Sequence, residues 1–211
     1  MAWSSFTAGL FTAGQVLTAA QMNTYVRDNL MAGGPIYATE ALRDAAITAP
    51  FEGQRAYITG STETTAAGAI TSIPTGIQTV YNGAGWVTVT PVGGQTVTSG
   101  TTTSTSFTTL TGGGTNPYAE LRTGTTALFS TFAYRSNSGA NSNYFGFSVS
   151  GATTLAAGGT FNSVTTVSGT TGQTGIITGL TAGVNRFTLA YAVSAGTGTY
   201  QDRFITVQGI A

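Results

Sequence analysis

From about residue 95 to the C-terminus, short runs of alternating apolar and polar residues are separated by stretches rich in glycine and asparagine. The cleanest run is 187–193, where large and small side chains alternate. Phe187, Leu189, Tyr191 and Val193 share one face, while Thr188, Ala190 and Ala192 share the other. Successive residues of a strand point to opposite sides of a sheet. We therefore expect this strand to bury its large residues and to leave a flat face of small ones.

The same alternation predicts further strands along this part of the chain. They are expected at 118–122, 127–134, 144–149, 161–167, 175–177, 184–193 and 204–207. Turns are expected at 112–117, 137–143, 158–159 and 169–172, and the threonine-rich stretch 101–109 is expected to form an edge strand. Many short strands at such spacing are typical of a β-sandwich. We predict a C-terminal jelly-roll-like β-sandwich domain over residues 95–211.

A smaller α+β module is predicted over residues 36–92. Thr39 is a suitable N-cap for a short helix over 39–46, and 55–59 has the pattern of a strand. The runs 77–81 and 86–89 flank Asn82-Gly83, the strongest short-range signal for a hairpin. We expect a three-stranded sheet with an apolar filling. Its members are Tyr57, Tyr81 and Trp86.

An N-terminal helical anchor is predicted over residues 1–35. Thr18 and Gln21 form a capping box, and Leu17 can pack on Met22. The apolar residues that need a partner surface here are Trp3, Phe6, Phe11, Leu17, Met22, Val26 and Leu30. A short helix is marginal alone. We expect these residues to dock on another protein; the alternative is packing on the protein's own downstream domain.

Composition narrows the classes of function. Only 7% of residues are charged, the formal net charge is zero, and the chain contains no His, Cys or Lys. Zinc sites, disulfides and Ser-His-Asp or Cys-His catalysis are thereby excluded. Seven scattered arginines form no basic patch for nucleic acid. Aromatic residues at 10% and recurring β-branched residues argue against disorder.

Membrane insertion and secretion are also not expected. No apolar run is long enough to span a bilayer. The first positive charge is Arg27, so the N-terminus has no basic region typical of a signal peptide. We expect synthesis in the cytoplasm.

Candidate chemistry is sparse. Glu120 and Asp202 each have a neighbouring arginine, Arg122 and Arg203, and are expected to form surface ion pairs. We expect no enzymatic activity, no catalytic residue, no metal and no cofactor. The stretch 135–144 offers uncharged hydrogen-bonding groups that suit recognition of a glycan or protein; the alternative is a solvated loop. Its candidate recognition residues are Asn137, Asn141, Asn143 and Tyr144.

Several segments resemble those of a known class of proteins. The run Ala13-Gly14-Gln15-Val16-Leu17 through Asp28-Asn29-Leu30 resembles an N-terminal signature of tailed-bacteriophage virion proteins. Segments 43–46, 52–58 and 80–87 are similar to the small module that follows this signature in those proteins. Segments 147–154 and 179–203 resemble phage tail and fibre β-domains. The resemblance touches all three predicted parts of the chain.

The resemblance implies a non-enzymatic virion structural protein, frequently a homotrimer, assembled in the host cytoplasm. It implies a minor tail or tail fibre protein for host attachment; the alternative is a capsid decoration or head fibre protein. The implied partners are sibling subunits, other virion proteins of the capsid, baseplate or tail, and a host surface glycan. A cell-wall-degrading tail enzyme would need a carboxylate pair or metal site, and a secreted adhesin would need a signal peptide.

Overall fold

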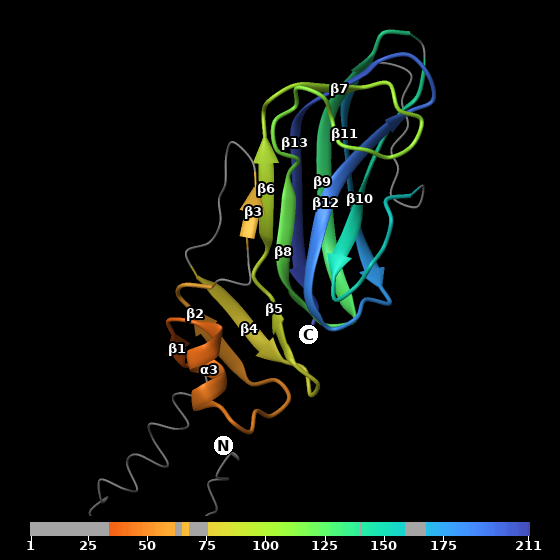
Figure 1. The fold of residues 1–211 in the computed structure, drawn as a ribbon. Coiled ribbons are helices and arrows are strands. Elements are labelled where there is room, and N and C mark those ends of the chain that lie inside the picture. The colour runs from red at the N-terminus through yellow and green to blue at the C-terminus, as the bar shows by residue number, and fades with distance from the viewer. Residues whose placement is uncertain (1–33, 62–64, 68–75, 140, 159–167) are drawn as a thin grey trace, which may run out of the picture.

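The computed structural model describes residues 34–61, 65–67, 76–139, 141–158 and 168–211. These residues are mainly β, with three sheets and one short helix. Figure 1 shows a small module, drawn in orange and yellow, at one end of a larger β-structure drawn in green and blue. No helix among the described residues is long and apolar enough to cross a membrane. The predicted strand at 161–167 lies outside the described residues.

The module is built on one four-stranded sheet, sheet A, with the order β1-β2-β4-β5. Its strands are β1 (Ile36–Tyr37), β2 (Arg55–Ile58), β4 (Ile77–Tyr81) and β5 (Trp86–Thr88). The sequence predicted three of these strands. The fourth, β1, has two residues and pairs in parallel with β2, so it carries too little alternation to be recognised.

The predicted helix and hairpin of the module are confirmed. Helix α3 (Glu40–Ala46) begins after Thr39, whose hydroxyl accepts a hydrogen bond from the backbone N–H of Leu42 at 3.3 Å. In the β4–β5 turn, the side-chain oxygen of Asn82 accepts from the N–H groups of Ala84 and Gly85. Gly83 has a φ of +86°, which a side chain would disfavour. Local chemistry therefore fixes both elements.

The interior of the module differs from the prediction. Trp86 is buried, and Tyr81 packs edge-on against it with ring centroids 5.6 Å apart. The guanidinium of Arg43 lies over the ring of Trp86, 4.5 Å from its centroid. Tyr57 is 40% exposed, so its predicted place in the core is wrong. Strand β2 turns its neighbours Ala56 and Ile58 inward, which directs Tyr57 outward.

The larger part consists of two antiparallel sheets that share one hydrophobic core, a β-sandwich-like arrangement. Sheet B has the order β10-β12-β8-β3, with β10 (Asn143–Gly151), β12 (Gly183–Val193), β8 (Tyr118–Thr123) and β3 (Thr65–Ala67). Sheet C has the order β11-β9-β13-β6, with β11 (Gly169–Thr178), β9 (Thr126–Asn137), β13 (Gly198–Gly209) and β6 (Val92–Thr96). A short strand, β7 (Gly100–Thr102), also pairs with β13. From β8 to β13, successive strands lie alternately in sheets B and C.

Strand alternation places the core as the sequence predicted for β12. Phe187, Leu189, Tyr191 and Val193 are all buried. The predicted turn at 169–172 is wrong, because these residues form the first part of β11 and pair with 132–135 of β9. Glycine in a strand interior weakens the periodic signal, since it supplies no side chain to alternate.

The module and the sandwich are not separated where the sequence placed their boundary. Strand β6 crosses the expected boundary at 92–95 and belongs to sheet C. Strand β3 lies between two module strands in the sequence, yet it is the edge strand of sheet B beside β8. At the junction, a Cβ on Gly209 would lie 2.6 Å from Cγ1 of Val87. The two parts therefore pack directly on each other.

A β-bulge in β13 changes which of its residues face the core. The pairing with β9 shifts between Gln201 and Phe204, and Asp202 has a φ of +49°. Without the extra residue, Tyr200 and Arg203 would point to opposite sides of the sheet. With it, both are fully buried. The bulge thus brings a tyrosine and an arginine into one end of the core.

Candidate functional site

Among the described residues, no group of three or more His, Cys, Asp or Glu side chains could hold a metal ion. Glu120 lies on β8 opposite Arg186 of β12, with Oε2 and Nη1 4.0 Å apart. The predicted surface pair of Asp202 with Arg203 is wrong, because Arg203 is fully buried and points away from solvent.

The apolar residues of the predicted anchor all lie outside the described residues. They are Trp3, Phe6, Phe11, Leu17, Met22, Val26 and Leu30. The anchor therefore stays a prediction from the sequence.

The predicted recognition loop lies at the end of the sandwich, between β9 and β10. The side-chain N–H of Asn137 donates to Oδ1 of Asn143 at 3.0 Å and to the carbonyl of Ala195 at 3.2 Å. Asn143 is 1% exposed, so its predicted role on a recognition surface is corrected. Asn141 and Tyr144 are half-buried.

Much of this loop's hydrogen bonding joins it to the β12–β13 turn. The N–H of Ser138 donates to the carbonyl of Thr197, and the hydroxyl of Ser138 accepts from the N–H of Thr197. Ser142 and Ser194 are joined in a similar reciprocal way. Some of the hydrogen-bonding groups that the sequence offers for a partner therefore join this loop to the β12–β13 turn.

Two arginines lie in the sandwich core near this end. Arg203 donates from Nη1 to Oδ1 of Asn116 at 3.3 Å and to the Tyr191 hydroxyl at 3.2 Å. Its Nη2 donates to the carbonyls of Thr98, at 3.1 Å, and Gly113. Arg203 thus ties β13 to the segment between β6 and β8, in a structural role.

The second arginine, Arg135, is equally buried in β9. Its Nη1 donates to the carbonyl of Asn143 at 2.9 Å, and its Nη2 donates to the hydroxyl of Thr171 at 2.5 Å. Burial lowers the pKa of Arg135, and the nearby Tyr200 partly opposes that shift. The two arginines flank the rings of Tyr191 and Tyr200, whose centroids are 4.9 Å apart with an interplanar angle of 54°.

The buried tyrosines predict a loss of stability at alkaline pH. Burial raises the pKa of Tyr191 to about 12, with the charge and hydrogen bond of Arg203 opposing the rise. Burial also raises the pKa of Tyr200. In the unfolded chain a tyrosine ionises near pH ~10. The folded protein therefore binds more protons between these values, and stability falls as pH rises.

We expect the free energy of unfolding to decrease by about 2–3 kcal/mol through Tyr191 once the pH has passed from ~10 to beyond ~12. Urea unfolding at a series of alkaline pH values measures this slope. Tyr191→Phe should show a shallower slope, whatever its stability at neutral pH. Equal slopes in the two proteins would contradict the assignment.

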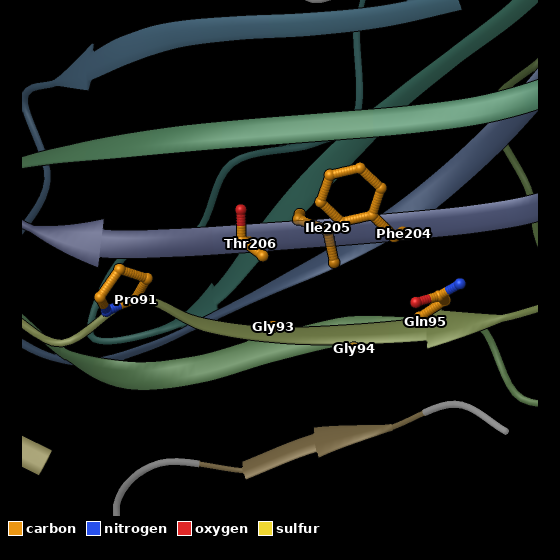
Figure 2. Close-up of a pocket in the computed structure, with 7 residues that line it drawn as sticks. All are labelled: Pro91, Gly93, Gly94, Gln95, Phe204, Ile205 and Thr206. Carbon is orange, nitrogen blue, oxygen red and sulfur yellow. The ribbon is translucent and has the colours of Figure 1, made fainter. Parts of the chain in front are cut away.

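The outer face of sheet C carries two adjoining hollows. The larger, of about 210 Å³, lies between β6 and β13 and is lined by Pro91, Gly93, Gly94, Gln95, Phe204, Ile205 and Thr206. Figure 2 shows these residues on the two neighbouring strands. The second, of about 120 Å³, extends from Pro91 and Thr206 across β9 to Thr174 of β11. Both are open surfaces on the solvent side of the sheet.

A third hollow lies where the module meets the sandwich. It has a volume of about 110 Å³ and is lined from the module by residues of the β4–β5 hairpin, Trp86 among them. From the sandwich it is lined by 122–124 and 182–183. This hollow is the space left where the two parts pack on each other, and we assign it no ligand.

Comparison with known proteins does not assign a family. No protein-family model matches the chain, and no curated protein matches it. One similar solved structure is the CBM22-1–GH10 part of xylanase 10B from Clostridium thermocellum in complex with xylohexaose. It has 14% identity and a TM-score of 0.31, over 74% of this chain and 26% of that one. This chain thus spans about a quarter of that protein's length.

A second similar structure is a cyclase from Fischerella sp. TAU. It has 12% identity and a TM-score of 0.26, over 54% of this chain and 75% of that one. At these scores neither likeness carries an argument about function.

Proposed function

We propose that this chain is a non-enzymatic structural protein of a tailed-bacteriophage virion, a minor tail or tail fibre protein that serves host attachment. The observation that carries the proposal is the run 13–30, which resembles the N-terminal signature of such proteins, followed by the module and the β-domain in the same order. The chain's low content of charged residues suits close association with neighbouring subunits. In this proposal the protein is assembled in the host cytoplasm as a homotrimer.

We also infer that the sandwich is a jelly roll. Successive strands that alternate between two sheets are expected of paired Greek-key connections. The alternation from β8 to β13 supports this, as does the pairing of the last strand, β13, with the early strand β6. In this arrangement the module and β6 join the sandwich from one end, and the loops beyond β9 and β12 lie at the other.

A position on the phage head is the second candidate. The module packs directly on the sandwich, and the described residues include no stalk between them. A compact body of this kind suits a capsid decoration or head fibre protein as well as a tail position. Immunogold labelling of intact particles separates the two, because label would cover the head in one case and be confined to the tail in the other.

Deleting residues 2–35 is expected to abolish incorporation into particles. The deletion removes every apolar residue of the predicted anchor, and with them the surface that the proposal assigns to the virion partner. The measurement is quantitative mass spectrometry of purified particles from phage carrying the full-length or the shortened gene. The double variant Leu128→Ser and Ile176→Ser, on the sandwich surface, serves as control and should be incorporated normally. Normal incorporation of the deletion would refute the anchor, and absence of the full-length chain from particles would refute the virion assignment.

A further inference from the structure

The outer face of sheet C combines aromatic rings with hydroxyl and amide groups. The side chains on it come from four strands that are distant in the sequence. They are Gln95, Leu128, Ser130, Phe132, Tyr134, Thr170, Thr174, Ile176, Phe204, Thr206 and Gln208. Of the charged residues in these four strands, Arg135 and Arg203 are buried, and Asp202 is half-buried at the bulge, where its Oδ2 accepts a hydrogen bond from Nε2 of Gln201.

Two rings lie side by side on this face. Phe132 of β9 and Phe204 of β13 are directly opposite in the register, and their centroids are 6.0 Å apart with an interplanar angle of 35°. Both are half-buried, so part of each ring is open to solvent. Tyr134 follows Phe132 on the same face of β9. Rings placed in this way form an apolar platform bordered by polar groups.

The platform adjoins the larger hollow between β6 and β13. Phe204 lines that hollow together with Gln95 and Thr206, as Figure 2 shows. At Gly93 the two strands approach closely, since a Cβ there would lie 2.4 Å from the carbonyl oxygen of Ile205. The second hollow continues from Thr206 to Ser130 and Thr174, whose hydroxyls are 3.0 Å apart. A shallow track therefore runs across the strands, with rings and hydrogen-bonding groups along it.

The kinds of side chain along this track favour some classes of ligand over others. Phosphate, nucleic acid and acidic glycans would be bound by arginine or lysine, and this face has neither. A permanent subunit interface would be more apolar than a face on which hydroxyl and amide side chains outnumber large apolar ones. A sugar ring fits both features. Its C–H groups are attracted to the negative faces of aromatic rings, and its hydroxyls both donate to and accept from amides and hydroxyls.

We propose that the outer face of sheet C binds a neutral oligosaccharide, with sugar rings stacked on Phe132 and Phe204 and hydroxyls bonded by Gln95 and Thr206. This inference rests on the proposed function in host attachment and names the class of ligand that the displayed domain takes. The proposed binding site is thus the outer face of sheet C and not the predicted loop at 135–144. Binding is expected to be insensitive to salt, since no ion pair contributes to it.

The test measures binding of the full-length protein to an array of neutral oligosaccharides, with sialylated and uronic-acid glycans as charged probes. We expect a neutral probe to bind, with an affinity unchanged between about 0.05 and 0.5 M NaCl. Phe204→Ala and Phe132→Ala should each weaken binding at least about tenfold. Tyr57→Ala, which removes an exposed aromatic ring from the module, is the matched control and should bind as wild type. Circular dichroism and thermal unfolding establish that each variant is folded.

Several results would overturn the proposal. They are no binding to any neutral probe, binding of charged probes alone, or neutral binding that both phenylalanine variants retain. A change in oligomeric state on Phe204→Ala, measured by light scattering, would instead identify the face as an interface between copies of this chain. The virion assignment fails separately, because it is measured by the presence of the chain in particles. If the protein is absent from particles but still binds a neutral glycan through Phe204, the proposed glycan site is supported and the virion role is refuted.

Discussion

Replacing Arg203 with methionine is expected to lower the free energy of unfolding by about 3 kcal/mol or more. Methionine keeps much of the aliphatic volume but offers no donor. The carbonyls of Thr98 and Gly113, the amide oxygen of Asn116 and the hydroxyl of Tyr191 would each lose a hydrogen bond from the guanidinium. A buried acceptor left without its donor costs about 1–3 kcal/mol. The losses do not add in full, because the segment between β6 and β8 can relax toward water.

Urea unfolding of the full chain measures this effect, with two variants for comparison. Arg55→Met makes the same chemical change on an exposed residue of β2 and should alter stability by less than about 0.5 kcal/mol. Arg203→Lys keeps the charge but lacks the planar fork of donors, so its stability should lie between wild type and Arg203→Met. A loss below about 1 kcal/mol for Arg203→Met would show that the four acceptors find other donors or water.

The orientation of Arg203 is the feature that sequence reasoning missed most clearly. In the sequence, Arg203 adjoins Asp202 and resembles half of a surface ion pair. The bulge directs Arg203 into the core, because the left-handed backbone at Asp202 places Arg203 on the same side of the sheet as Tyr200. No local pattern marks the bulge, because an aspartate gives only a weak preference for that conformation. A charged residue in a strand is expected at the surface, so the sequence alone predicts the wrong side of the sheet for Arg203.

The elements that were predicted well depend on contacts close in the sequence. The Thr39 cap, the Asn82-Gly83 turn and the alternation of β12 each involve a few neighbouring residues. The outer face of sheet C could not be predicted in this way. Phe132 and Phe204 meet only because β9 and β13 pair. The alternation of residues within each strand does not indicate which strands will pair in a sheet.

The predicted recognition loop failed for a related reason. Asparagine and serine in a glycine-rich stretch indicate a loop correctly, but they do not say whether their amides face solvent or a second loop. Asn143, the first residue of β10, is buried, and the side-chain amide of Asn137 donates to the carbonyl of Ala195 in the β12–β13 turn. The composition of this stretch predicts the loop correctly, but the prediction that its side chains are free to bind a partner is only partly right.

Replacing Phe147 with alanine is expected to cost about 3–5 kcal/mol of stability. Phe147 belongs to sheet B, and its ring contacts Phe129 of sheet C and Phe187 of sheet B, with centroid distances of 4.9 and 5.7 Å. All three rings are buried and meet edge to face. Removing the central ring leaves a cavity between the sheets and breaks two aromatic contacts at once. If the alanine variant does not fold, Phe147→Leu, with an expected cost of about 1–2 kcal/mol, keeps the effect measurable.

Phe132→Ala is the matched control, because it makes the same change on the opposite side of sheet C. Its ring is half-buried and borders solvent, so we expect a cost of no more than about 1 kcal/mol. Guanidinium unfolding of wild type, Phe147→Ala and Phe132→Ala gives the comparison directly. Comparable losses for the two alanine variants would mean that Phe132 packs as a core residue, and the outer face of sheet C would then no longer be a free surface for a glycan. A large difference between them would show that folding does not require the ring of Phe132, which is the property expected of a side chain available to a ligand.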